Sequence, residues 1–174
     1  DDGSDPPLTT ESKIAKIIYT NDKRPFTSSL ARNRTALQAK GEYIIFADCD
    51  HIITKEIIEK VRNFTGDFVR FNRAFGIIDD NGDITQDLDV LRKYGLSEAR
   101  IKVHGTYLNC HRNQYAVTKD FFLNVMKGYN ERLILTKPYP QREDGDFSKR
   151  WNVLHAQGKI KDFDGKFEPI KKEY

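Results

Sequence analysis

The stretch Ile44-Ile45-Phe46-Ala47-Asp48-Cys49-Asp50 decides the expected fold, because an apolar run leads directly into two aspartates. A short, continuous apolar run of this kind predicts a strand buried on both faces, as in a parallel sheet. Open α/β sheets bind their ligands at the carboxyl ends of the strands. Because side chains alternate along a strand, continued extended geometry would put Asp48 and Asp50 on one side and Cys49 on the other.

The residues alone leave two uses open for this pair of carboxylates. Asp48 and Asp50 either hold a hard divalent cation or fold back to cap a helix. Mg²⁺ and Mn²⁺ prefer oxygen ligands and often bridge protein to substrate phosphates through one or two carboxylates. Asp-x-Asp after a strand is therefore equally compatible with a metal site and with a helix cap.

Length and composition indicate one globular domain covering residues 1–174. The net charge is +3 and the basic residues are scattered, so a nucleic-acid partner is not expected. No stretch approaches the roughly 20 apolar residues of a membrane span. The chain has two cysteines, and Cys49 lies in the strand motif predicted to be buried. A structural disulfide is therefore not expected, and a reducing, cytoplasmic location is favoured.

The order of apolar periods and turn residues predicts strands alternating with helices, which is typical of an α/β sandwich. Helices are expected where a hydroxyl residue precedes an apolar period and glycine ends it, and strands where β-branched and aromatic residues cluster. The expected caps are Ser28 or Ser29, Thr54 and Thr118, and Gly158 is the expected stop of the last helix. The expected strands are 14–19, 44–47, 67–71 and 75–78, the last turning back through Asn81-Gly82; the expected helices are 28–40, 54–64, 88–94, 118–128 and 147–157, and the tail from Lys159 is expected to be peripheral.

Three acids, Glu143, Asp144 and Asp146, come at the start of the last expected helix. Acidic residues at a helix N-terminus are favoured by the helix dipole, so this cluster has a purely structural explanation. The alternative is that one of them is a catalytic acid or base. By itself the cluster favours the structural explanation, as composition does for Arg32 and Arg34 on the first expected helix.

Four motifs occur in one order along the chain: Asp1-Asp2-Gly3-Ser4, Ala31-Arg32-Asn33-Arg34, Gly41 to Asp50 with its Asp-Cys-Asp, and Glu143-Asp144-Gly145-Asp146-Phe147. In this order they resemble the family-2 type inverting glycosyltransferases of the GT-A fold, including the chondroitin-synthase-like branch. The stretch from Lys119 to Glu131 also resembles the acceptor side of that family. The resemblance runs from Asp1 to about Gly158 and implies a nucleotide-sugar-binding sandwich with a mostly parallel central sheet.

The resemblance implies a role for five residues. Asp2 matches the acid that hydrogen-bonds the nucleotide base, and Arg32 matches a basic residue beside that base. Asp48 matches a residue touching the ribose or the metal, and Asp50 matches the metal ligand on the diphosphate. Asp144 matches the catalytic base. The implied cofactor is Mn²⁺ or Mg²⁺, the favoured donor is a UDP-sugar, and the acceptor is a carbohydrate or another hydroxyl compound, as in polysaccharide biosynthesis.

Two departures from the family pattern concern the start of the chain and a histidine. The family begins with a strand and a helix before Asp-Asp-Gly-Ser, which predicts that this sequence is truncated at its N-terminus. Family members also often use a C-terminal histidine as a metal ligand. His155 lies eleven positions beyond Asp144 on one expected helix, roughly 16 Å away, and one turn from Trp151. We therefore expect His155 to pack rather than to bind metal.

The chemistry of glycosyl transfer requires the same groups. A divalent metal stabilises the charge on a departing diphosphate, which suits Asp48 and Asp50. A carboxylate takes the proton of the attacking hydroxyl, which suits Asp144. Displacement on the opposite face inverts the anomeric centre. Two alternatives remain: a sugar nucleotidyltransferase, for which no glycine-rich phosphate loop is visible, and an inactive module that binds a nucleotide or a partner protein.

Overall fold

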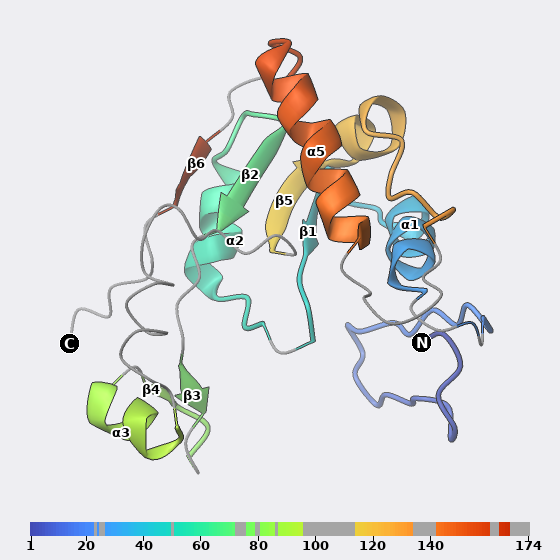
Figure 1. Ribbon diagram of the computed structural model, residues 1–174. Coiled ribbons are helices and arrows are strands. Elements are labelled where there is room, and N and C mark those ends of the chain that lie inside the picture. Colours follow the sequence, from blue (N-terminus) through green and yellow to red (C-terminus); the bar gives the residue numbers. More distant parts are fainter. Residues whose placement is uncertain are drawn as a thin grey trace. The chain divides into compact units, whose positions relative to one another are not determined.

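The computed structural model describes residues 1–22, 24, 27–49, 51–71, 76–78, 81–85, 87–95, 114–133, 142–160 and 164–167 (Figure 1). The chain divides into two compact units, one made of Asp1–Phe46 and Val117–Lys161 and the other of Ala47–Ala116 and Asp162–Tyr174. Each unit is thus assembled from two separate stretches of sequence. The prediction of a single domain over residues 1–174 remains a prediction.

The first unit contains two long helices, a strand and a π-helical turn. Strand β5 (Tyr115–Thr118) straddles the boundary between the units and has β1 as one hydrogen-bonded neighbour and β2 as the other. The elements of the first unit are α1 (Ser28–Gln38), β1 (Tyr43–Phe46), η2 (Phe121–Val125) and α5 (Arg142–Ala156). The helix starts and ends therefore fall close to those that the sequence predicts, except that α5 begins earlier, at Arg142.

Aromatic side chains form the core of the first unit. Phe122 is fully buried and lies 4.9 Å from the ring of Phe46 and 6.0 Å from that of Phe147. Phe147 in turn stacks on Tyr129 with 4.4 Å between ring centroids. Burying a phenylalanine side chain contributes roughly 1.5–3 kcal/mol. This cluster joins β1, η2, α5 and the loop after η2 into one core.

The segment predicted as a helix from Thr118 to Gly128 contains one extra residue in its turn. Thr118 accepts a hydrogen bond from the Phe121 amide through its hydroxyl, as the sequence predicts for a capping residue. The Met126 amide then donates to the Phe121 carbonyl, five residues back, which defines the π-turn. Gly128 ends the segment with φ +63°, a conformation that glycine adopts without steric cost.

The second unit combines a parallel strand pair with a small hairpin. β2 and β6 are parallel, with Val69 opposite Asp164, and Phe68 of β2 stacks on Tyr115 at 4.9 Å. β3 and β4 pair in antiparallel fashion around the predicted Asn81-Gly82 turn. The elements are α2 (Lys55–Arg62), β2 (Phe68–Phe71), β3 (Ile77–Ile78), β4 (Ile84–Thr85), α3 (Leu88–Lys93) and β6 (Asp164–Phe167). Parallel pairing is thus present, whereas a mostly parallel central sheet remains a prediction.

Three expectations about the strands are wrong. Residues 14–19 form no strand, and Ile14 is 99% exposed. The tail after Lys159 is not merely peripheral, because β6 lies in it. β1 is buried on one face only, since Ile44 and Phe46 are buried while Tyr43 and Ile45 are half-buried. The first two differences show that tertiary pairing, rather than local β-propensity, decides which segments become strands.

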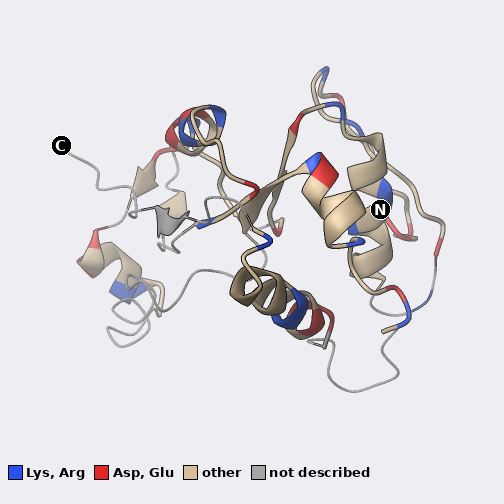
Figure 2. Ribbon diagram, turned by 90° about the horizontal axis from the view of Figure 1, so that it is seen from above, with Lys and Arg blue, Asp and Glu red and all other residues tan. Residues whose placement is uncertain are grey.

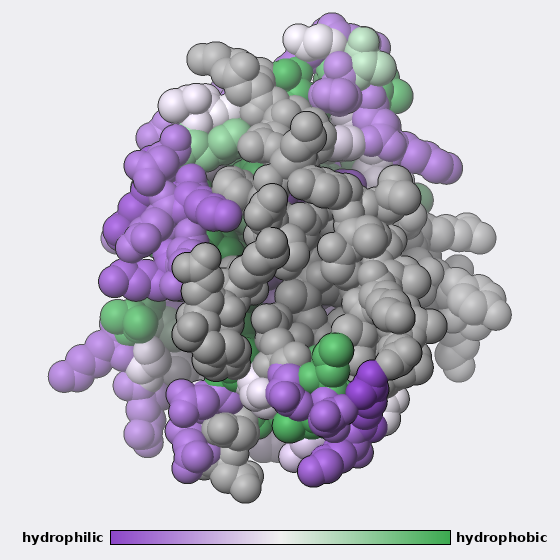
Figure 3. Space-filling model, turned by 90° about the vertical axis from the view of Figure 1, so that its left-hand side faces the viewer, coloured by the Kyte–Doolittle hydropathy of each residue, from purple (hydrophilic) through white to green (hydrophobic). Residues whose placement is uncertain are grey.

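The surface is polar and mixed in charge. Figure 2 shows Lys and Arg interspersed with Asp and Glu along the described ribbon, in agreement with the predicted absence of a basic stripe. The face in Figure 3 is largely hydrophilic where it is described, with hydrophobic residues in small groups. Among the described residues, no helix has the length and apolar character needed to cross a membrane.

Candidate functional site

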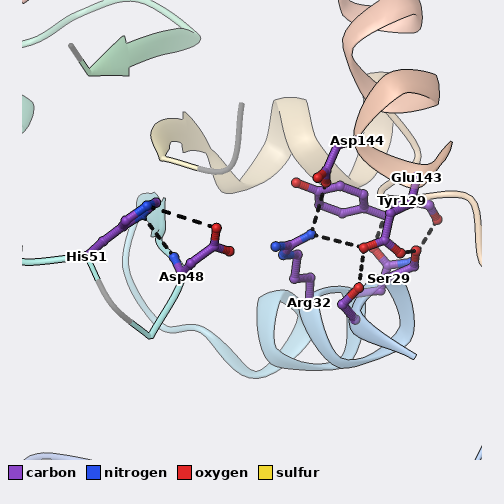
Figure 4. Close-up of polar contacts among 9 residues, drawn as sticks. Ser29, Arg32, Asp48, His51, Tyr129, Glu143 and Asp144 are labelled. Atoms are coloured by element: carbon purple, nitrogen blue, oxygen red, sulfur yellow. Dashed lines mark hydrogen bonds and ion pairs between the residues drawn. The ribbon is translucent and has the colours of Figure 1, made fainter. Parts of the chain in front are cut away.

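The acid–arginine cluster of the first unit comprises Glu143 and Asp144 at the start of α5 and Ser28, Ser29 and Arg32 on α1 (Figure 4). The Ser28 and Ser29 hydroxyls each donate to one carboxylate oxygen of Glu143. Arg32 Nη1 lies 3.5 Å from Glu143 Oε1 and 3.3 Å from Asp144 Oδ1. Two residues that the sequence singles out, Arg32 and Asp144, are therefore brought together.

The two neighbouring carboxylates of this cluster differ in access to solvent. The Glu143 side chain is 7% exposed, whereas that of Asp144 is 20% exposed. The third acid, Asp146, is held by Arg150 one turn further along α5, with 2.9 Å between Arg150 Nε and Asp146 Oδ2. Asp144 is thus the more accessible of the two carboxylates that share Arg32.

Arg32 also contacts an aromatic ring. Its guanidinium carbon lies 5.1 Å above the ring of Tyr129, within range of a cation–π contact. Asn33 fixes the backbone of Tyr129 twice, because its side-chain oxygen accepts from the Tyr129 amide and its nitrogen donates to the Tyr129 carbonyl, at 2.8 and 2.9 Å. A Cβ at Gly128 would lie 2.5 Å from the Asn33 side-chain oxygen, so this approach requires glycine.

Asp2 reaches the beginning of α1, where the hydroxyl of Thr27 donates to its carboxylate. Thr27 occupies the N-cap position of α1 but makes no side-chain capping hydrogen bond. The prediction that Ser28 or Ser29 caps this helix is therefore wrong. The physical reason is competition, because these hydroxyls are used by carboxylates from elsewhere in the chain instead of by the first amides of the helix.

Asp48 lies in the second unit, in a turn that His51 closes (Figure 4). The His51 amide donates to the Asp48 carbonyl at 3.0 Å, and the Asp48 amide donates to His51 Nδ1 at 3.1 Å. The chain therefore turns after β1, so the extended geometry that would align Asp48 with Asp50 does not continue beyond Asp48. Cys49 is exposed in this turn, so its predicted burial is also wrong. Asp50 lies outside the described residues.

The donor atoms of this turn fit a divalent cation in part. The Asp48 side chain is 30% exposed, and His51 Nε2 lies 4.0 Å from Asp48 Oδ2. Because Nδ1 accepts a hydrogen bond from an amide, Nε2 is the ring nitrogen left to face the carboxylate. Carboxylate oxygen is a ligand that Mg²⁺ and Mn²⁺ accept. In a neutral imidazole whose Nδ1 accepts a hydrogen bond, Nε2 carries the proton, so His51 faces Asp48 as a donor and not as a metal ligand. Within the described ranges no three His, Cys, Asp or Glu side chains gather into a metal-binding group.

His155 stacks on Trp151, with the rings nearly parallel and their centroids 5.7 Å apart. The prediction that this histidine packs against Trp151 is confirmed. His104 and His111, which are polar candidates within 103–115, lie outside the described residues.

Comparison with known protein families gives a match. A family model described as "Glycosyl transferase family 2" matches residues 1–114, which is 114 of 174 residues and more than half of the chain. The chain therefore belongs to this family of sugar-transferring enzymes. The family implies a GT-A α/β fold and a glycosyltransferase that uses nucleotide-sugar donors. No curated protein and no solved structure matches the chain. Asp2, Arg32, Asp48 and Asp50 lie within the matched range, whereas Asp144 lies beyond it.

Sequence reasoning missed four residues that organise these places: Ser28, Ser29, Asn33 and His51. The serines were interpreted as helix caps, and their use by a carboxylate over one hundred positions away has no local signal. Asn33 belongs to the Ala31-Arg32-Asn33-Arg34 motif, but the motif does not predict that its side chain binds the backbone of Tyr129. His51 follows Asp48 by three residues, a spacing that suits a turn closed by a side chain.

Proposed function

We propose that this chain is a metal-dependent glycosyltransferase that moves a sugar from a nucleoside-diphosphate sugar to an acceptor hydroxyl with inversion. The favoured donor is a UDP-sugar carrying a hexose, and the favoured acceptor is a carbohydrate in polysaccharide synthesis. The Asp-Cys-Asp triplet makes the chondroitin-synthase-like branch our preferred relative. The observation that carries the proposal is the accessible carboxylate of Asp144 beside Arg32, in a chain of this family.

Asp144 is the proposed general base. Asp144 lies in the first turn of α5. Its side chain is partly open to solvent and accepts a hydrogen bond from the guanidinium of Arg32. An acceptor hydroxyl becomes a better nucleophile when a carboxylate takes its proton during attack. In-line attack from the face opposite the leaving diphosphate gives the inverted product. The ¹H NMR coupling of the anomeric proton in the product distinguishes inversion from retention.

Asp48 and Asp50 are the proposed metal ligands, with His51 beside Asp48. The charge that develops on the departing diphosphate would be offset by a bound divalent cation, Mn²⁺ or Mg²⁺. The part of this set that is described supports the assignment, because the Asp48 carboxylate is partly exposed in the turn after β1.

Asp2 and Arg32 are the proposed contacts of the nucleotide base. Asp2 accepts from Thr27 at the start of α1, and Arg32 lies little more than one helical turn further along the same helix. At about 1.5 Å per residue, Thr27, which contacts Asp2, and Arg32 are separated by roughly 8 Å along the helix axis, which is the scale of a nucleoside.

The decisive experiment incubates the chain with a panel of nucleotide sugars and Mn²⁺, with and without carbohydrate acceptors, and identifies the products. Release of a nucleoside diphosphate supports the proposed transferase. Release of pyrophosphate from a nucleoside triphosphate and a sugar phosphate would instead identify a nucleotidyltransferase. Binding of a nucleotide without any turnover would identify an inactive module. A thermal-shift screen of the same panel with and without Mn²⁺ selects the donors to test.

A further inference from the structure

We propose that Arg32 and Glu143 are positioning residues that together govern the ionisation of Asp144, with Glu143 as the fixed end of the pair and Arg32 as the shared charge. The arrangement of charges follows from the contacts alone. Its consequence for turnover rests on the proposed function, in which Asp144 is the base.

Glu143 is fixed because its carboxylate is nearly buried and has three donors around it. The Ser28 and Ser29 hydroxyls donate to its two oxygens, and Arg32 approaches one of them. All three donors come from the first two turns of α1, and the side chain is only 7% exposed. An ionised carboxylate accepts hydrogen bonds at both oxygens and donates none, which suits this set of donors. Glu143 therefore joins the start of α5 to the start of α1.

Arg32 is shared because a single nitrogen serves both carboxylates. Its Nη1 lies 3.5 Å from Glu143 and 3.3 Å from Asp144, whereas charge-assisted hydrogen bonds close to about 2.7–2.9 Å when one acceptor is served alone. The guanidinium also contacts the ring of Tyr129, whose backbone is held by Asn33. Arg32 thus stabilises the negative charge of Asp144 only in part, because the same guanidinium nitrogen also interacts with Glu143.

Other charged and titratable groups lie on the elements that carry this cluster. From α5 itself they are Asp146 and Arg150, which pair with each other at 2.9 Å. From the segment after η2 they are the Tyr129 phenol and Glu131, whose carboxylate accepts from Asn33. Asp2 lies at the start of α1. Because neither substitution changes the charge of these groups, the effects of Arg32→Gln and Glu143→Gln on Asp144 can be compared with each other.

The two substitutions are expected to act on Asp144 in opposite directions. Arg32→Gln removes the positive charge and leaves Glu143 next to Asp144, so Asp144 takes up a proton more readily. Glu143→Gln removes the neighbouring negative charge and frees Arg32 to close on Asp144, so Asp144 loses its proton more readily. An opposite charge at this distance typically moves a carboxyl titration by roughly one pH unit or more. If Arg32 and Glu143 only supported the helices, the two substitutions would shift the titration of Asp144 in the same direction or not at all.

The test follows the Asp144 carboxyl carbon by NMR titration of the ¹³C-aspartate-labelled chain, with the signal assigned by its loss in Asp144→Asn. We expect the midpoint to rise in Arg32→Gln and to fall in Glu143→Gln, each by about one pH unit. Arg34→Gln on the same helix, whose guanidinium donates to the Thr20 carbonyl, and Glu59→Gln on α2 are the matched controls and should leave the midpoint in place. Midpoints that move together, or that do not move, would overturn the proposal.

A second variant covers the case in which Glu143→Gln does not fold, as judged by circular dichroism. Ser28→Ala combined with Ser29→Ala keeps the charge of Glu143 and removes two of its donors, so Glu143 draws Arg32 toward itself. The Asp144 midpoint should then rise, by less than in Arg32→Gln. An unchanged midpoint in this variant would also overturn the proposal.

The pH profile of kcat/KM separates this inference from the proposed function. If Asp144 is the base, the acidic limb should follow the NMR midpoints upward in Arg32→Gln and downward in Glu143→Gln. If both variants keep wild-type turnover and an unchanged Asp144 midpoint, the charge-sharing inference is wrong, whereas the proposed transferase activity is not affected. Midpoints that move in opposite directions while the acidic limb stays still would uphold the charge sharing and remove Asp144 from the role of base.

Discussion

The acid–arginine cluster and the Asp48–His51 turn hold their carboxylates in different ways. In the first, contacts cross more than one hundred positions of sequence, as between Ser28 and Glu143, and the anchoring carboxylate is nearly buried. In the second, the contacts join residues three positions apart, and the Asp48 side chain is 30% exposed. The carboxylates of the cluster are therefore held by distant parts of the chain, whereas the turn is held by its own neighbours and leaves the Asp48 carboxylate partly open to solvent.

The largest expected effect comes from replacing Asp144 in the acid–arginine cluster. Asp144→Asn keeps the size of the side chain and removes its basicity, so turnover should fall by roughly 10²-fold or more while nucleotide-sugar affinity stays nearly intact. Steady-state kinetics and calorimetric binding on the same preparation measure the two quantities. Asp146→Asn is the matched control, because that carboxylate pairs with Arg150. Near-wild-type turnover in Asp144→Asn would show that Asp144 is structural and that the base lies elsewhere, with Asp146 and Glu143 next to be tested.

The second prediction tests how rigidly the cluster is supported, with a glycine from each unit. Gly128→Ala should destabilise the fold by about 2 kcal/mol, since a non-glycine residue in this left-handed conformation costs roughly 1–2 kcal/mol and the new Cβ would collide with Asn33. Gly82→Ala, with φ +84° and no described atom within 4 Å of its Cβ, shares only the backbone cost. Denaturant unfolding measures both, and equal losses would show that the Asn33 contact is not restrictive.

The third prediction breaks the second region. Asp48→Asn and Asp50→Asn should each weaken Mn²⁺-dependent nucleotide binding by roughly tenfold or more, because even residues behind the direct ligands of a metal contribute on that scale. The fold should remain intact, since Asp48 sits in a partly exposed turn after β1. Calorimetric titration with and without Mn²⁺ gives the effect, and Asp89→Asn, at an exposed position on α3, is the control. Unchanged Mn²⁺ dependence in both variants would rule out the metal assignment.

The smallest effect concerns a short-range pair in the first unit, which resembles the Asp48–His51 turn in being local. Arg24 donates to Asp22 at 2.8 Å and lowers the pKa of that carboxyl to about 2 from an ordinary value of 3.8. The stability that this pair contributes is present above about pH 3.8 and is lost as the pH falls toward 2. NMR titration should show the Asp22 midpoint rising toward its ordinary value in Arg24→Gln. A midpoint that stays low in that variant would assign the shift to another group.

The sequence predicted those parts of the fold that depend on local pattern. The Thr54 cap of α2, the Asn81-Gly82 hairpin and the stop of α5 at Gly158 each follow from a few adjacent residues, and each is confirmed. Parallel pairing could not be located in this way. β6 reads Asp-Gly-Lys-Phe, a poor strand by propensity, and becomes one because β2 lies beside it.

The candidate site shows the same division between local and distant information. Arg32 and Asp144 were identified by the order of motifs, but their ion pair depends on packing between helices that begin at Ser28 and Arg142. The task of the two serines was not predictable, because a hydroxyl at a helix start favours a cap in any sequence. Asp48 was identified from its strand, yet the turn after it depends on His51, whose side chain competes for the backbone amide.

The pairing of β2 with β6 has a consequence for how the protein is made. Val69 and its partner Asp164 are 95 positions apart, so a ribosome adding roughly 5–20 residues per second needs roughly 5 to 20 s to supply the partner. During that interval one edge of β2 is without its final neighbour, and an unpaired edge strand recruits other chains. Nascent chains of this protein should therefore depend on chaperone binding until the last strand emerges.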